Sequence, residues 1–237
     1  QVGMGHVYRS LSLAKDLTDH EIIFVTDTGS KLAIGELTNY QYQVDVYNIS
    51  DIVRSIRSLN PNLVVLDMLD TEADDIQELR KDRISIVSFE DLGTGSKYTD
   101  LTINELYDRP QLPGKNYRWG SEYFFVRDEF SRARPNVYRE KVESLLLVFG
   151  GTDQHDLTRK IYYSVRDLCR RNNMLIQIVT GPGYKHYKKF SNEIRGVHDV
   201  TLTHATGVIS KVMEKSCLAI TSNGRTVYVL AHMSIPS

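Results

Sequence analysis

Two glycines and a histidine near the start of the chain have residue types and a spacing that suit a ligand-binding turn. Gly3-Met4-Gly5-His6 precedes a run in which apolar residues recur at helical spacing, at Val7, Leu11 and Ala14. This pattern predicts a tight turn that opens a helix with a core-facing stripe. The free N–H groups and positive dipole end of such a helix suit phosphate or the leaving group of a sugar nucleotide. The turn by itself is equally consistent with a histidine that is satisfied within the core.

His6 is the leading catalytic residue that the sequence offers. Its ordinary pKa lies near neutrality, and a place at a helix start favours the neutral, basic form, so it can take up or release a proton. Gly3, Gly5 and Arg9 are expected on the substrate side of the same turn. The position of Arg9 also fits a plain surface charge.

Acidic residues follow two of the expected strands. Asp67 and Asp70 come at and after one strand, where they could orient a histidine or a water molecule, or bind sugar hydroxyls. Asp70 fits equally well as the cap of the next helix. Glu90 and Asp91 follow another buried strand, where contact with substrate hydroxyls and simple solvation are both open. Ligands of parallel sheets gather at such strand ends.

Two turns in the second half of the chain are compatible with phosphate. The first is Gly150-Gly151-Thr152-Asp153, and the second is Ser222-Asn223-Gly224-Arg225-Thr226. Hydroxyls, free N–H groups and an arginine suit a diphosphate. Each turn alone is an ordinary turn signal, and neither is a P-loop. Because both are expected at strand ends of one α/β unit, together they favour a nucleotide site.

Strands alternate with helices along both halves of the chain. In the first half we expect strands at 21–26, 42–49, 62–67, 84–89 and 101–103, and helices at 30–37, 51–58 and 71–81, with Thr71 as the N-cap of the last. In the second half we expect strands at 144–149, 174–180, 199–203 and 217–221, and helices at 156–171, 184–194, 207–215 and 225–231. Alternation of this kind predicts parallel sheets with right-handed crossovers. The expected fold class is α/β, with Rossmann-like domains at 1–134 and 135–237 that face a cleft and are joined by a polar linker near 131–136.

Composition excludes several classes of protein. The 237 residues carry a net charge of −1 without a sustained basic run, so nucleic acid is not expected as a partner. The apolar clusters are too short to cross a bilayer. Cys169 and Cys217 are expected as buried thiols rather than a bridge or metal pair. The sequence therefore predicts a cytoplasmic protein with neither metal nor cofactor.

Both ends of the chain look cut. It begins directly at the glycine turn, without an initiator methionine or a signal peptide, and closes within the α/β pattern. We expect part of a longer protein, either fused to other sugar-biosynthesis enzymes or working with them.

Several motifs occur in an order that resembles one family. They are the G-x-G-H turn ending at His6, the L-D region from Leu66 to Asp70, Ser88-Phe89-Glu90-Asp91, Arg118-Trp119-Gly120 with the segment from Phe125 to Phe130, and Phe149 to Asp153. Over nearly the whole chain, this order resembles the UDP-sugar hydrolases of pseudaminic acid biosynthesis and the spore-coat polysaccharide proteins of the SpsG group. More distantly, it is similar to the MurG-type glycosyltransferases.

The resemblance implies a GT-B fold, with the sugar or acceptor in the first domain and the nucleotide in the second. It implies metal-independent hydrolysis of a UDP-linked trideoxy-diacetamido sugar at its anomeric carbon. His6 would activate or position the attacking water. Gly150, Gly151 and the Ser222–Gly224 turn would bind the diphosphate.

The chain departs from the family at two positions. The last helix of the family usually presents a glutamate near its first turn, where this chain has Val227 and Tyr228. An aromatic residue that commonly follows the L-D motif is Leu69 here. A nucleotide-sugar hydrolase is the leading hypothesis. The alternatives are a GT-B glycosyltransferase, in which His6 deprotonates an acceptor hydroxyl, and a non-catalytic sugar-nucleotide binding domain of a larger protein.

Overall fold

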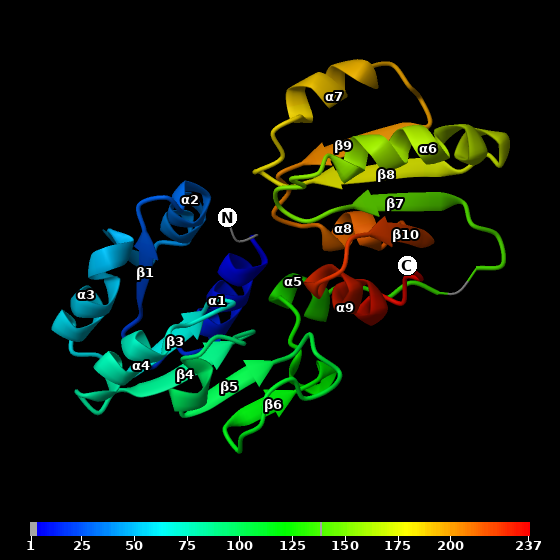
Figure 1. Ribbon diagram of the computed structural model, residues 1–237. Coiled ribbons are helices and arrows are strands. Elements are labelled where there is room, and N and C mark those ends of the chain that lie inside the picture. The colour runs from blue at the N-terminus through cyan, green and yellow to red at the C-terminus, as the bar shows by residue number, and fades with distance from the viewer. Residues whose placement is uncertain (1–3, 138) are drawn as a thin grey trace. The chain divides into compact units, whose positions relative to one another are not determined.

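The computed structural model describes residues 4–137 and 139–237 (Figure 1). Contacts divide the chain into two compact units, one of His6–Phe125 and one of Val126–Ser237, and Met4 and Gly5 group with the second. The sequence placed the division between residues 134 and 135 instead. The contacts place it earlier because Phe130 is buried in the core of the second unit, and the Asn136 side chain donates to the carbonyls of Met213 (2.8 Å) and Ser216 (2.6 Å).

The first unit contains two parallel sheets. β3, β4, β5 and β6 form one in that order, and β1 pairs with β2 in the other. The helices and strands are α1 (Gly5–Asp16), β1 (Ile23–Asp27), α2 (Lys31–Asn39), β2 (Gln43–Tyr47), η1 (Ile49–Asp51), α3 (Ile52–Ser58), β3 (Leu63–Asp67), α4 (Ala73–Arg80), β4 (Ser85–Phe89), η2 (Ser96–Tyr98), β5 (Leu101–Asn104), β6 (Tyr117–Trp119) and η3 (Ser121–Tyr123).

The core of this unit lies between its strands and α3 and α4. Ile86 of β4 is fully enclosed, and it clusters with Ile56 of α3 and with Ile76 and Leu79 of α4. On α1, Leu11 and Ala14 of the predicted stripe are buried, whereas Val7 is only half-buried. The apolar periodicity therefore located the buried side of the helix, because residues three and four apart share a helix face.

Two local features in this unit differ from the predictions. No strand was predicted at 117–119, where three residues form β6 and pair with β5. Thr71 is not the N-cap of the following helix, because α4 begins at Ala73 and the Ala73 N–H donates to Thr94 Oγ1 at 3.0 Å. Thr71 is instead buried, and its hydroxyl donates to Asp91.

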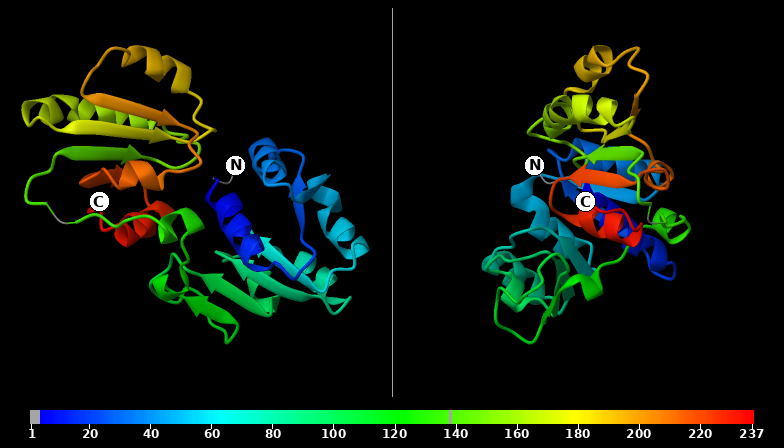
Figure 2. Two further views of the ribbon diagram at one scale, coloured as in Figure 1. Left: turned by 180° about the vertical axis from the view of Figure 1, so that it is seen from behind. Right: turned by 90° about the vertical axis from the view of Figure 1, so that its right-hand side faces the viewer.

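The second unit is built on one parallel sheet in the order β10, β7, β8, β9, which Figure 2 shows from two further sides. Its elements are α5 (Asp128–Ser131), β7 (Ser144–Val148), α6 (Leu157–Arg171), β8 (Leu175–Thr180), α7 (Tyr187–Glu193), β9 (Val200–His204), α8 (Ser210–Met213), β10 (Leu218–Thr221) and α9 (Arg225–His232). Every residue of β7 is buried. Alternate residues serve opposite faces, with Leu145 and Leu147 packing beside α6 and α7, and Leu146 and Val148 packing beside α8 and α9.

The α/β fold class with parallel sheets is confirmed in both units. Cys169 and Cys217 carry free thiols; Cys169 is buried as predicted, whereas Cys217 is only half-buried. Across the described ranges, no helix has the length and apolar character that a membrane span needs. No group of three or more histidine, cysteine or acidic side chains among those same residues is placed to hold a metal ion.

Candidate active site

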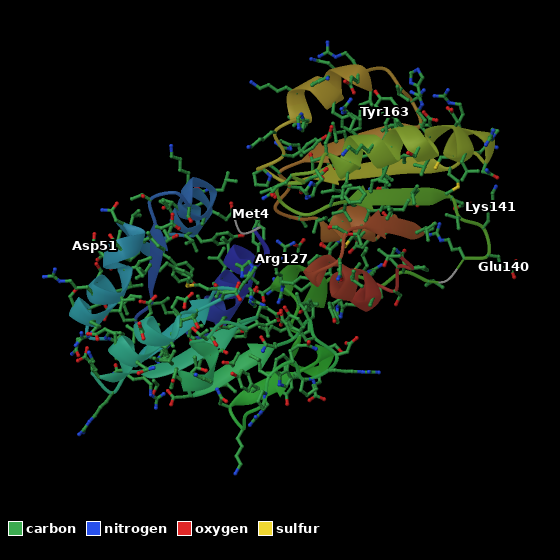
Figure 3. The ribbon with its side chains drawn as sticks, in the orientation of Figure 1. Met4, Asp51, Arg127, Glu140, Lys141 and Tyr163 are labelled. Atoms are coloured by element: carbon green, nitrogen blue, oxygen red, sulfur yellow. The ribbon has the colours of Figure 1, made fainter. Side chains whose placement is uncertain are left out.

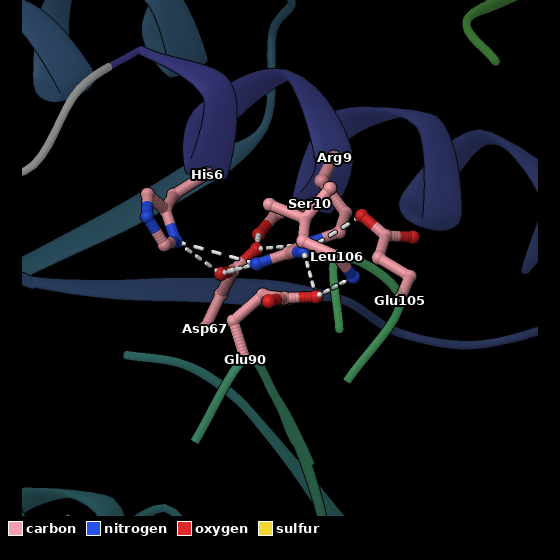
Figure 4. A network of polar contacts seen from close by, with 7 residues as sticks. All are labelled: His6, Arg9, Ser10, Asp67, Glu90, Glu105 and Leu106. Atoms are coloured by element: carbon pink, nitrogen blue, oxygen red, sulfur yellow. Dashed lines mark hydrogen bonds and ion pairs between the residues drawn. The ribbon is translucent and has the colours of Figure 1, made fainter. Parts of the chain in front are cut away.

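Four residues predicted from the sequence meet in the first unit, where α1 faces the ends of β3 and β4 (Figure 4). His6 Nδ1 hydrogen-bonds to Asp67 Oδ1. Arg9 grips the same carboxylate with two donors, Nε to Oδ2 at 2.8 Å and Nη2 to Oδ1. Ser10 Oγ donates to Asp67 Oδ2 at 3.3 Å, and Glu90 Oε1 lies 3.7 Å from Arg9 Nη1. Asp67 is thus the common partner of three side chains of α1.

The parallel register explains why these acids converge. Asp67 stands opposite Phe89 on β4, and Phe89 stands opposite Ile103 on β5. Glu90 and Glu105 therefore follow neighbouring strand ends at one edge of the sheet, as parallel pairing requires. On α1, Arg9 and Ser10 follow His6 by three and four residues, which places each of them on the helix face of His6.

Arg9 is buried, with 1% of its surface exposed, so its interpretation as a surface charge is wrong. Its Nη1 donates to Glu105 Oε1 at 2.9 Å, and its guanidinium carbon lies 5.0 Å from the centre of the Phe89 ring. A buried cation needs opposite charges and hydrogen bonds to offset its lost hydration. The carboxylates of Asp67, Glu90 and Glu105 supply them here.

The electrostatics of the pair suit His6 to act as a base. Burial alone would raise the pKa of Asp67, but hydrogen bonds from Arg9 and His6 outweigh it, so this pKa lies below its ordinary value. An ionised Asp67 accepts a hydrogen bond from His6 Nδ1 only if Nδ1 carries a proton. The neutral His6 ring is therefore in the tautomer whose Nε2 has the free lone pair. The His6 side chain is 21% exposed, and no hydrogen bond within the described residues involves its Nε2. His6 can therefore take a proton from a group that approaches from solvent.

Other residues predicted for the first unit lie outside this cluster. Asp91 is fully buried and holds loops together, because it accepts from the N–H groups of Thr71 (3.0 Å) and Gly93 (2.9 Å). Asp70 is exposed, and it does not cap the next helix, whose N-cap position is Glu72. The helix α1 begins at Gly5, which is exposed. Gly3 lies outside the described residues.

Sequence reasoning missed Glu105 and Ser10. Glu105 directly follows β5 and is fully enclosed beside Arg9, so the rule that selected Glu90 at the end of β4 would have found it. Ser10 is four residues after His6, and helical spacing alone places both on one face of α1.

The two glycine turns of the second unit follow neighbouring parallel strands, β7 and β10. Their ends therefore share one edge of that sheet. Gly150 is exposed with φ +78°, and Gly224 has φ +117°, a region that favours glycine. A Cβ on Gly151 would stand 2.8 Å from Met4, which Figure 3 labels, and a Cβ on Gly181 would stand 2.4 Å from the Gly151 backbone. These glycines allow the loops after β7 and β8 to pack closely.

The polar residues of these turns have different local roles. Asp153 caps α6, because its two carboxylate oxygens accept from the N–H groups of Leu157 and Thr158, each at 2.8 Å. Asn223 Oδ1 accepts from the Gly224 N–H at 2.9 Å. Arg225 opens α9, whose first turn contains no acidic residue. Thr152, Ser222, Arg225 and Thr226 are half-buried.

Comparison with known sequences gives relatives but no family model that matches. The chain is 26% identical over 255 residues to the uncharacterized protein MJ1062 of Methanocaldococcus jannaschii, covering all of this chain and 52% of that protein. It is also 26% identical over 225 residues to the UDP-2,4-diacetamido-2,4,6-trideoxy-beta-L-altropyranose hydrolase of Campylobacter jejuni, covering 91% of this chain and 78% of that enzyme. The chain thus spans about half the length of the first relative and most of the second.

Solved structures share the architecture at low identity. The MurG of Acinetobacter baumannii matches with a TM-score of 0.61 at 14% identity, over 97% of this chain and 73% of that one. The Staphylococcus aureus MnaA–UDP structure matches with a TM-score of 0.61 at 11% identity, over 98% and 75%. The fold is that of the GT-B proteins. A UDP-GlcNAc 2-epimerase from Neisseria meningitidis bound to UDP-GlcNAc also matches, with a TM-score of 0.58 at 12% identity over 94% and 76%.

Proposed function

We propose that this GT-B protein is an enzyme that hydrolyses a UDP-sugar and releases a modified amino-deoxy sugar. The observation that carries the proposal is the His6–Asp67 pair, whose Nε2 is left available as a base. The Campylobacter jejuni hydrolase, 26% identical over 91% of this chain, favours the same reaction. The proposed setting is the cytoplasmic biosynthesis of a surface polysaccharide or a nonulosonic acid.

In the proposed step, His6 Nε2 takes a proton from a water molecule while the water oxygen bonds to the anomeric carbon of the sugar. The bond from that carbon to the β-phosphate oxygen breaks, and UDP leaves with the electron pair. Asp67 holds the ring and stabilises the imidazolium that forms. The first unit would hold the sugar.

The second unit would hold the nucleotide. Its turns at Gly150–Asp153 and Ser222–Thr226 offer backbone N–H groups and hydroxyls, together with Arg225, to the charge that develops on the diphosphate. The hydrogen bonds that Asp153 and Asn223 accept would shape these turns, and neither side chain would contact phosphate directly.

The likeness to MurG favours a second candidate, a glycosyltransferase. In that reaction His6 would deprotonate an acceptor hydroxyl in place of water. The absence of an acid from the first turn of α9 favours a third, a domain that binds a sugar nucleotide without turning it over.

The test is incubation of the protein with UDP-linked 2,4-diacetamido-trideoxy sugars and with UDP-GlcNAc, following free UDP and free sugar. We expect sugar release without any acceptor, its loss in His6→Gln, and its retention in the control His20→Gln, since His20 is an exposed histidine of the same unit. In ¹⁸O-water the released UDP should carry no label, because attack at carbon leaves the phosphate oxygen with UDP.

Each rival predicts a distinct result. Release only when an acceptor sugar is present would establish the transferase. Binding of the nucleotide without turnover under every condition would support the third candidate, a domain that only binds a sugar nucleotide. Full activity in His6→Gln would refute the role of His6.

A further inference from the structure

Arg9 has no surface with which to meet a substrate. Its side chain is 1% exposed, and its guanidinium is held by Asp67 on one side, Glu105 on another and the Phe89 ring on a third. Glu105 is itself fully enclosed. The substrate contact that the sequence suggested for Arg9 therefore does not fit the environment of this side chain.

The contact with Arg9 offsets the charge of the Asp67 carboxylate and also fixes the plane of that carboxylate. Nε and Nη2 point to the two different oxygens of the carboxylate, and two parallel donors of this kind orient a carboxylate in a way that a point charge cannot. The Asp67 oxygen that accepts from Arg9 Nη2 is the one that meets His6 Nδ1. Any rotation of the carboxylate would therefore move the His6 ring.

We propose that Arg9 and Glu105 are positioning residues, with Glu105 fixing Arg9, Arg9 fixing Asp67, and Asp67 setting the orientation and tautomer of His6. The proposal rests on the proposed function only in taking His6 as the base. The arrangement joins the ends of β3 and β5 to α1 through side chains that are nearly or fully enclosed.

Charged groups from four elements surround His6. They are Arg9 on α1, whose Nη2 lies 3.3 Å from His6 Nδ1, then Asp67 at the end of β3, and Glu90 and Glu105 after β4 and β5. Glu105→Gln keeps the shape of the side chain but removes one negative charge, so the contact that fixes Arg9 becomes weaker. Arg9 then holds the Asp67 carboxylate less firmly, and the His6 ring should lose part of its fixed orientation.

The first measurement is the tautomer of the His6 ring, read from its ¹⁵N NMR shifts in the intact chain and in Glu105→Gln. We expect the Nδ1–H tautomer in the wild type and a loss of part of its population in Glu105→Gln, because Arg9 then holds Asp67 less firmly. The control Glu21→Gln removes an exposed carboxylate of the same unit and should leave the ¹⁵N shifts unchanged. Equal ¹⁵N shifts in Glu105→Gln and Glu21→Gln would overturn the proposal.

The second measurement separates positioning from a purely structural charge. Arg9→Lys keeps the positive charge but loses the two parallel N–H donors that orient the Asp67 carboxylate. We therefore expect kcat for UDP-sugar hydrolysis to fall about tenfold to a hundredfold, with little change in KM. Full kcat in Arg9→Lys would show that charge alone suffices and would overturn the positioning role.

The two measurements also separate this inference from the proposed function. The NMR measurement does not require turnover, so a changed His6 tautomer in Glu105→Gln supports the positioning role even if the protein hydrolyses no UDP-sugar and the proposed reaction fails. A protein that hydrolyses UDP-sugar but shows no change of the His6 tautomer in Glu105→Gln supports the reaction and refutes the positioning role.

Discussion

Replacement of Asp67 by Asn tests the centre of the cluster most directly. The carboxylate accepts from Arg9 Nε at 2.8 Å, from Arg9 Nη2, from His6 Nδ1 and from Ser10 Oγ at 3.3 Å. An amide has one oxygen, so its NH₂ group must face a donor of Arg9 or His6. The substitution therefore removes a charge and also sets two donors against each other.

The expected loss of stability follows from the number of bonds. Hydrogen bonds to a charged group contribute about 1.5–3 kcal/mol each, and breaking a buried ion pair costs about 3–5 kcal/mol. Glu105 and Glu90 still offset the charge of Arg9, so we expect the lower part of this range, about 3 kcal/mol. Activity should fall further, by about 10²–10⁴-fold, because His6 loses its orienting partner.

The effect of pH has a definite direction. Because folding lowers the pKa of Asp67, the unfolded chain binds that proton more readily, and the ionised carboxylate stabilises the fold. This contribution is complete above the ordinary carboxyl pKa of about 4 and is lost as pH falls through the lower pKa of the folded state. The difference in unfolding free energy between wild type and Asp67→Asn should therefore shrink in acid.

Urea unfolding followed by circular dichroism, at neutral pH and in acid, measures this difference. The matched control is Asp82→Asn, which breaks a solvent-exposed pair with Arg57 and should change stability little at either pH. If Asp67→Asn unfolds and turns over substrate as Asp82→Asn does, the reasoning from the buried cluster is refuted.

Three further substitutions test the second unit. Asp153→Ala removes the cap of α6 and should cost about 0.5–2 kcal/mol, measured by thermal unfolding; an unchanged Tm would contradict the cap. Gly181→Ala places a Cβ 2.4 Å from the Gly151 backbone and should cost about 1–3 kcal/mol and weaken UDP binding by calorimetry, whereas Gly207→Ala, with nothing within 4 Å, should leave UDP binding unchanged. Leu147→Ala empties a fully enclosed position of β7 and should cost about 2–5 kcal/mol in urea; a loss below 1 kcal/mol would mean that the core refills the space.

Local pattern in the sequence was enough to locate most of the elements. Alternating strands and helices indicated parallel sheets, and the strand that ends in Asp67 and the strand before Glu90 were placed nearly to the residue. The short strand β6 was not predicted, because three residues carry no periodicity that distinguishes a strand from a loop. The cap of α4 was not predicted either, because Thr94, which supplies it, lies 21 residues from Ala73.

The sequence by itself determined which residues have useful chemistry and that they stand at strand ends and at a helix start. Only the tertiary structure decided which of them meet. Arg9 and Asp67 are 58 residues apart, and their contact depends on α1 lying against the ends of neighbouring strands. Adjacent Glu90 and Asp91 look alike in sequence, yet Glu90 pairs with Arg9 while Asp91 secures loops, since successive side chains leave the backbone in different directions. Spacing along the chain records helix faces and strand ends, but the order of strands in a sheet sets which ends are neighbours.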